Sequence, residues 1–243
     1  MSAEMSVAVI DKIVVTNNPT IQASKVTGEE RKQESILAPL EKRVLLWLVK
    51  HIPKQINSDH LSLIGLLAMF LAGLCYYLSR FDVRALHLVN FALALNWFGD
   101  SLDGNLARYR NKQRPKYGFY VDHIIDTFGT SFLIMGLILS GYMSERIAWG
   151  MLMVYFMLSI NSYLAAYSLG VFSISFWKFS PTEIRIILAL GNLVLISHPY
   201  CKIMGKQYLI YDVGGVISII GMSLMLVVST IKNTVTLYRK ERV

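Results

Sequence analysis

Four aspartates at helical spacing are the residues of this chain whose types and positions could do chemistry. Asp100 and Asp103 stand three positions apart, and Asp122 and Asp126 stand four apart. Residues at these spacings share a face of a helix, so each pair would present two carboxylates together. Carboxylate oxygens are the hard ligands that Mg²⁺ and Mn²⁺ prefer. The spacing therefore predicts a site for divalent cations between two facing helices.

Both aspartate pairs adjoin long apolar runs, where an ionised carboxylate is costly unless it is paired or metal-bound. The chain of 243 residues is 54% apolar and 16% charged. The uncharged runs Leu61–Ser79, Thr127–Met143 and Val213–Ile231 approach the roughly 20 residues that cross a bilayer. These features predict an all-α integral membrane protein.

The elements that must position the aspartates are expected to be six transmembrane helices. We expect an amphipathic helix at residues 36–52 before them, lying on the membrane surface or packed on the protein's own cytoplasmic face. Residues 1–35 are expected to form a mobile polar tail, and residues 36–243 to form the membrane domain. The expected spans lie near residues 58–79, 85–105, 119–143, 147–171, 181–200 and 209–233.

The distribution of basic residues predicts the orientation. With six spans, both termini share one side of the membrane with the aspartates. Outside the N-terminal tail, that side would hold fifteen lysines and arginines, and the opposite side five. Cytoplasmic loops carry such an excess, so the termini and the site are expected in the cytoplasm. Because the basic residues cluster beside spans, anionic lipid headgroups are the expected counter-charges, and a nucleic acid is not expected as a partner.

The stretch from Asp100 to Asp126 resembles the signature of the CDP-alcohol phosphotransferase family, D-x-x-D-G-x-x-A-R followed by G-x-x-x-D-x-x-x-D. All eight fixed positions are present in this sequence: Asp100, Asp103, Gly104, Ala107, Arg108, Gly118, Asp122 and Asp126. The interval from Arg108 to Gly118 is one residue longer than is usual in the family. The extra residue falls in a turn rich in lysine and arginine, which could loop out without moving either helix.

The resemblance implies a membrane transferase of phospholipid biosynthesis. Such an enzyme moves a substituted phosphate from a CDP-alcohol, such as CDP-diacylglycerol, to an acceptor hydroxyl and releases CMP. The resemblance implies a two-metal site for Mg²⁺ or Mn²⁺ held by the four aspartates, with Asp126 also the base that takes the acceptor's proton. It assigns Gly104, Ala107, Arg108 and Gly118 to binding of the CDP-alcohol. Family members are often homodimers, which implies a homodimer here.

Two further places are weaker candidates for binding. Asp59 and Ser62 precede the first span where many family members have Pro-Asn-x-x-Thr, which makes them candidates for nucleotide contact. Glu183 and Arg185 open the fifth span, where charged side chains are costly. They are candidates for an acceptor or lipid-phosphate site, and ordinary interfacial residues are the alternative.

Other functions remain open from the residues alone. His123 beside Asp122, together with Glu183, is similar to the choline/ethanolamine branch of the family, which joins a CDP-amino alcohol to diacylglycerol. A divalent cation transporter is a remote alternative. Transporter ion sites lie near the middle of the membrane, whereas these aspartates flank a basic turn at helix ends.

Overall fold

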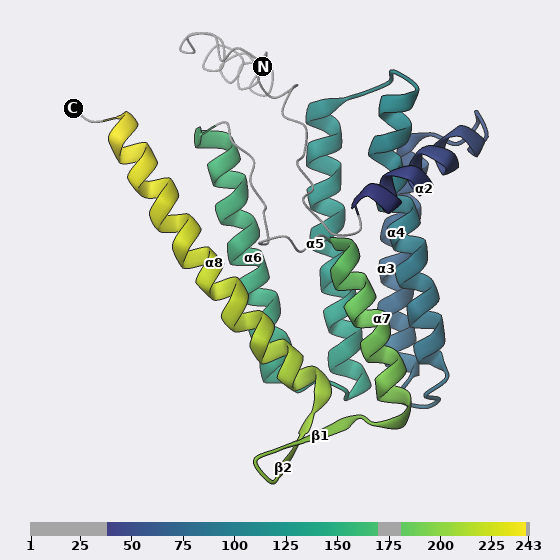
Figure 1. Cartoon of the computed structure of the whole chain (residues 1–243), viewed down its shortest axis with the longest axis vertical. Helices are drawn as coiled ribbons and strands as arrows, with labels where there is room; N and C mark the ends of the chain where they lie inside the picture. The colour runs from purple at the N-terminus through teal and green to yellow at the C-terminus, as the bar shows by residue number, and fades with distance from the viewer. Residues whose placement is uncertain (1–37, 170–180, 242–243) are drawn as a thin grey trace, which may run out of the picture. The chain divides into compact units, whose positions relative to one another are not determined.

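The computed structural model describes residues 38–169 and 181–241, which are almost entirely helical. The expected tail at residues 1–35 lies outside these residues. In chain order the elements are α2 (Ala38–His51), α3 (Ser58–Leu78), α4 (Ala85–Tyr109), α5 (Pro115–Ser140), α6 (Glu145–Leu169), α7 (Pro181–Ser197), β1 (Tyr200–Ile203), β2 (Lys206–Leu209) and α8 (Ile210–Lys240) (Figure 1). Each of the six expected spans thus coincides with one long helix.

Four of these helices, α3, α5, α6 and α8, are long and apolar enough to cross a membrane. Among the described helices, α4 and α7 do not have both the length and the apolar composition that a membrane span needs. The second half of α4 carries charged signature residues, and α7 has 17 residues. A helical membrane protein is consistent with this set, which is the fold class that the sequence predicts.

Helix α3 packs against both α4 and α5 along its length, and glycines set the distances. A Cβ atom added to Gly136 of α5 would lie 2.2 Å from the carbonyl oxygen of Gly73 in α3. A Cβ added to Gly99 of α4 would lie 2.6 Å from the carbonyl oxygen of Leu61. Small residues of this kind let helix backbones approach closely in membranes. The two helices that carry the aspartates are therefore held against one central helix.

A buried polar cluster joins α3, α4, α7 and α8. The side-chain oxygen of Asn192 accepts hydrogen bonds from the hydroxyls of Tyr76 (2.7 Å) and Tyr211 (2.5 Å). The amide nitrogen of Asn192 donates to the side chain of Asn90 at 2.7 Å, and Asn90 donates in turn to the carbonyl of Ala189 at 3.1 Å. Tyr76 and Asn192 are completely buried. This Asn192 cluster fixes how α7 is rotated and how far it is shifted along its neighbours.

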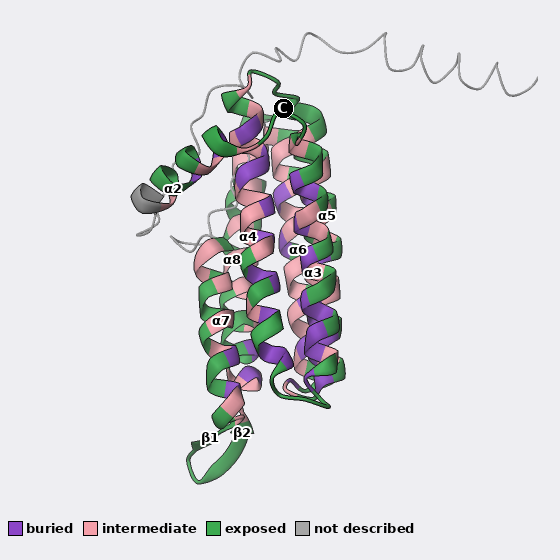
Figure 2. Cartoon of the chain, turned by 90° about the vertical axis from the view of Figure 1, so that its right-hand side faces the viewer, coloured by how far each residue is buried: buried purple, intermediate pink, exposed green. Residues whose placement is uncertain are grey.

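Helix α2 packs on the protein's own surface, one of the two expected placements. It buries Leu45 and Val49 in a small cluster with Leu102 and Leu106 of α4. Trp47 is 60% exposed on another side of α2. Figure 2 shows exposed residues along the outer side of α2, and buried ones gathered along α3, α4 and α5.

A β-hairpin between α7 and α8 was not expected. The span expected at 181–200 ends at Ser197, and an antiparallel pair of four-residue strands follows, with Tyr200 opposite Leu209. Met204 and Gly205 form the turn with φ angles of 50° and 81°. Two successive positive φ values are typical of the tight turns that join hairpin strands. Figure 1 shows the hairpin at the end of the bundle remote from the α4–α5 turn.

Candidate active site

All eight signature positions lie inside helices, five in α4 and three in α5. Helix α4 stops at Tyr109, and Asn111 just beyond it has a φ of 53°. Two backbone hydrogen bonds terminate the helix, from Asn111 N–H to Arg108 C=O (3.1 Å) and from Lys112 N–H to Ala107 C=O (2.9 Å). This pair of bonds is the Schellman motif. Helix α5 then begins at Pro115, whose fixed φ suits the first helical position. The turn between the two helices thus occupies residues 110–114.

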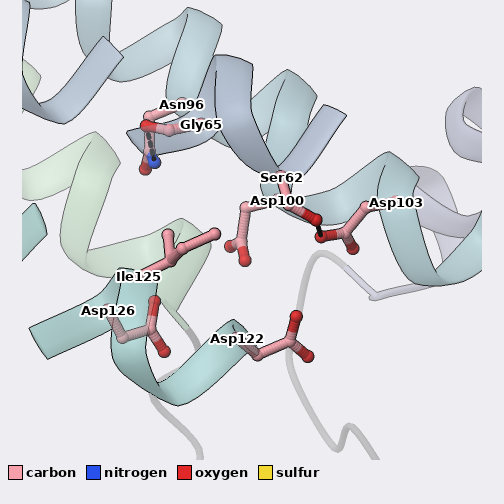
Figure 3. Close-up of a pocket in the computed structure, with 8 residues that line it drawn as sticks. All are labelled: Ser62, Gly65, Asn96, Asp100, Asp103, Asp122, Ile125 and Asp126. Carbon is pink, nitrogen blue, oxygen red and sulfur yellow. Dashed lines mark hydrogen bonds between the residues drawn. The ribbon is translucent and has the colours of Figure 1, made fainter. Parts of the chain in front are cut away.

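The four signature aspartates line one pocket between α4, α5 and α3 (Figure 3). The other residues that line it are Ser62, Gly65, Asn96 and Ile125. In Figure 3 the carboxylates of Asp100, Asp122 and Asp126 point into the space between α4 and α5. The predicted pairing of the two carboxylate pairs across a helical hairpin is what the structure shows.

Asp103 is the buried member of the set, at 7% exposure. Its Oδ2 accepts a hydrogen bond from the hydroxyl of Ser62 at 2.6 Å, and its Oδ1 accepts from the backbone N–H of Gly104 at 2.5 Å. The hydroxyl of Ser58 donates to the backbone carbonyl of Asp103 at 2.9 Å. The start of α3 thus fixes this carboxylate in one orientation. Ser62, a candidate for nucleotide contact, thus lies in the pocket and is bonded to Asp103.

Asp100 is paired with a cation from a distant part of the chain. Arg185 of α7 donates from Nη2 to Oδ2 of Asp100 at 2.6 Å and from Nε to the side-chain oxygen of Asn96 at 2.7 Å. The side chain of Arg185 is 15% exposed and that of Asp100 is 39% exposed. Asn96 also donates to the backbone carbonyl of Gly65 at 3.0 Å, which fixes its amide. The structure therefore brings Arg185 to the edge of the aspartate pocket.

Glu183 does not share the position of Arg185. The two residues are two positions apart on α7, so at 100° per residue their side chains leave the helix on roughly opposite sides. Arg185 contacts α4 through Asp100 and Asn96, and Glu183 is half-buried. Helical geometry thus separates the two candidate residues for an acceptor site.

Asp59 lies outside the set of residues that line the pocket. It forms an ion pair with Arg114, whose guanidinium also lies over the ring of Tyr117, 4.1 Å from the centroid. The hydrogen bond and charge of Asp59 raise the pKa of Arg114 above its usual range, and Tyr117 adds to the effect. Both side chains are about half exposed, so the pair contributes little to stability. Its effect is to tie the start of α3 to the α4–α5 turn.

Two signature glycines border open space. A Cβ atom added to Gly118 would meet nothing within 4 Å, and one added to Gly104 would meet only the Arg108 guanidinium, at 3.5 Å or more. The Arg108 side chain is exposed and donates to Asn105 at 3.0 Å. Ala107 is half-buried on the same helix. Close helix packing therefore does not explain these two glycines, in contrast to Gly99 and Gly136.

The pocket offers the ligands that a hard cation prefers. Four carboxylates, the amide of Asn96 and the hydroxyl of Ser62 are all oxygen ligands. Within residues 38–169 and 181–241, no three acidic, histidine or cysteine side chains form a ready-made cluster of metal ligands. Two of the aspartates have other partners in this structure, Asp100 with Arg185 and Asp103 with Ser62. The oxygen atoms that line the pocket are nevertheless of the type that Mg²⁺ and Mn²⁺ prefer.

Asn96, Gly65 and Arg110 are site or supporting residues that sequence reasoning missed. Asn96 stands four positions before Asp100, so a polar residue on the same helix face was a readable signal. Arg110 donates to the carbonyls of Ile52, Pro53 and Ile56, and so locks the α2–α3 connection to the α4–α5 turn. Its basic charge alone gave no sign of that role.

The chain is similar to known proteins over most of the helical bundle. The model of a family described as CDP-alcohol phosphatidyltransferase matches residues 54–230. Archaetidylinositol phosphate synthase of Pyrococcus horikoshii is 33% identical over 113 residues, which are 46% of this chain and 53% of that protein. The similarity thus spans about half the length of that curated relative.

Proposed function

Because this chain belongs to the CDP-alcohol phosphatidyltransferase family, we propose that it transfers a substituted phosphate from a CDP-alcohol such as CDP-diacylglycerol to an acceptor hydroxyl. The acceptor oxygen forms a new bond to the phosphorus distal to cytidine. The bond from that phosphorus to the bridging oxygen breaks, and CMP leaves with that oxygen. The observation that carries the proposal is the pocket lined by all four signature aspartates.

Asp100, Asp103, Asp122 and Asp126 would hold Mg²⁺ or Mn²⁺, which would neutralise charge on the diphosphate and on the leaving CMP. Ser62 holds the buried Asp103 carboxylate in one orientation through a hydrogen bond of 2.6 Å. Asp126 is the exposed member of the set, so an acceptor hydroxyl can reach it. Asp126 takes the proton of that hydroxyl as the oxygen attacks.

The donor would lie at the end of the α4–α5 hairpin where the turn joins the two helices. The free space at Gly104 and Gly118 lets a nucleotide approach the backbone directly. Arg108 is exposed on the same helix, and its guanidinium suits two phosphate oxygens at once. Ala107 completes the set of small residues along this surface.

Arg185 would receive the acceptor. Its guanidinium stands at the edge of the pocket, held by Asp100 and Asn96. The similar protein from Pyrococcus horikoshii is named for making archaetidylinositol phosphate, a lipid whose headgroup carries a further phosphate. An acceptor with a phosphate of its own would suit the guanidinium by charge and shape. We therefore favour a phosphorylated polyol as acceptor and a CDP-linked diacyl or dialkyl lipid as donor.

All six long helices would cross the membrane, α4 and α7 among them. The basic excess near the α4–α5 turn supports a cytoplasmic site with both termini on that side. A homodimer is proposed on family resemblance alone. With Cys75 and Cys201 replaced by serine, Lys112→Cys and Lys202→Cys, each labelled with an impermeant thiol reagent in sealed vesicles, should react from opposite sides.

The decisive experiment is CMP release by the purified protein in detergent or nanodiscs. CDP-diacylglycerol, CDP-choline and CDP-ethanolamine are each offered with Mg²⁺ or Mn²⁺ and a panel of acceptors that includes inositol and inositol phosphate. We expect CMP only with a divalent cation, and its near-complete loss in Asp103→Asn and Asp122→Asn. Full turnover in excess chelator would refute the metal site. Turnover with CDP-choline and diacylglycerol would point to the choline/ethanolamine branch.

A further inference from the structure

One carboxylate on α2 connects the start of α7 to the rest of the bundle. Oε1 of Glu41 accepts a hydrogen bond from the indole N–H of Trp97 in α4 and another from the hydroxyl of Thr182 in α7, both at 2.9 Å. Glu41 and Thr182 are 141 residues apart in the chain. Figure 1 shows the beginning of α2 beside the beginning of α7. Three helices therefore meet at a single oxygen atom.

The contact lies one turn from the guanidinium that faces the aspartates. Thr182 and Arg185 are three positions apart on α7, so they share a face of the helix. Thr182 is held by Glu41, while Arg185 is held by Asp100 and Asn96. The first turn of α7 is thus fixed at two points on the same face.

We propose that Glu41 is a positioning residue for the acceptor side of the site. By holding Thr182, it sets where α7 begins and so keeps the Arg185 guanidinium at the edge of the aspartate pocket. Oε1 of Glu41 is already engaged by Trp97 and Thr182, so in this proposal Glu41 acts through α7 and not on a substrate. The inference rests on the proposed function, because the measured quantity is binding of the acceptor.

The two groups that donate to Glu41 are neutral, so the proposal predicts different results for two substitutions of this residue. An amide oxygen accepts from an indole N–H and a hydroxyl as a carboxylate oxygen does. Glu41→Gln therefore keeps the geometry and removes only the charge. If position matters, Glu41→Gln behaves like the unaltered protein, whereas Glu41→Ala does not.

The test is steady-state kinetics of CMP release for Glu41→Ala, Glu41→Gln and Thr182→Val. The last variant removes the hydroxyl at nearly constant volume. We expect the acceptor KM to rise about tenfold in Glu41→Ala and Thr182→Val, with the donor KM unchanged. The double variant should be no worse than Glu41→Ala alone, because Glu41→Ala already removes the connection to Thr182. Lys42→Ala, an exposed neighbour on α2, is the matched control.

An unchanged acceptor KM in both Glu41→Ala and Thr182→Val overturns the proposal and leaves the proposed function standing, provided that the unaltered protein releases CMP. Equal damage in Glu41→Gln and Glu41→Ala also overturns it, since charge and not position would then be the cause. If the unaltered protein releases CMP from no donor, the proposed function fails first. Amide hydrogen exchange of residues 185–189, the first amides of α7 that have intrahelical acceptors, then decides the positioning role, which requires faster exchange in Thr182→Val than in Lys42→Ala.

Discussion

The glycines of this chain differ in what surrounds them, and the difference separates packing from binding. Gly73, Gly99 and Gly136 have the backbone of another helix where a Cβ atom would stand. Gly118 has open space at the same position. A glycine without a neighbour is not required for helix packing, so a ligand that lies against the backbone is the better reason for it.

Gly118→Leu should leave folding unchanged and raise the donor KM by about tenfold or more, because the side chain fills space that the nucleotide needs. Gly136→Ala should do the opposite and lower the yield of folded protein, since its methyl group meets the α3 backbone. Size-exclusion profiles and CMP-release kinetics of both variants check this contrast. Misfolding of Gly118→Leu would return that glycine to a packing role.

Arg108→Lys keeps the positive charge but replaces a two-pronged contact with a point charge. We expect the donor KM to rise several-fold at an unchanged acceptor KM, measured with saturating cation. Arg114→Lys, in the turn that follows, serves as control. An unaltered donor KM would make Arg108 a flanking charge beside the membrane.

At the scale of elements, α7 is the helix that adds a charge of opposite sign to the aspartate hairpin. With saturating donor and cation, Arg185→Gln should raise the acceptor KM about tenfold and change the donor KM little. Glu183→Gln is the matched control, because its side chain leaves α7 on the other side. Similar kinetics for both variants would place the acceptor pocket on another helix.

The sequence was most informative where structure is local. Asp100 and Asp103 share a face of α4 because helical geometry alone places them there, and the turn after Arg108 could be read from its basic composition. The contacts of Arg185 with Asp100 and of Thr182 with Glu41 span 85 and 141 residues. Such contacts depend on how each helix is rotated about its axis, which the apolar composition of a membrane helix hardly specifies. The roles of Arg110 and Glu41 were missed for this reason.

The hairpin between α7 and α8 was missed for a different reason. Lys202, Lys206 and Gln207 interrupt the apolar character of the helices on either side, so the sequence predicts a connection between two spans here. The turn is made by Met204 and Gly205, both at positive φ, and only the second of them is a residue type usual at such a position. The pairing of the connection into two short strands was therefore not predicted.

At the scale of the whole bundle, the Asn192 cluster is the buried contact that joins α3, α4, α7 and α8. Asn192→Leu would leave the hydroxyls of Tyr76 and Tyr211 without their shared acceptor. An unsatisfied buried donor costs about 1–3 kcal/mol, so we expect a loss of roughly 2 kcal/mol and a Tm lower by about 4–8 °C. Thermal unfolding in one detergent measures it, with the exposed Leu193→Ala as control. An equal Tm for the two variants would show that the cluster is dispensable.

The order in which the chain is made has a consequence for the pairing of Arg185 with Asp100. The α4–α5 hairpin carries all four aspartates and is complete at Ser140, before any residue of α7 has been synthesised. Arg185 follows Asp100 by 85 residues, which at about 5–20 residues per second is a delay on the order of ten seconds. During that interval the nascent hairpin holds its carboxylates at the membrane without the guanidinium. On the proposed metal site, cations available during translation would be their first counter-charge, so Arg185→Gln should insert as efficiently as the unaltered protein in a cell-free synthesis with membrane vesicles.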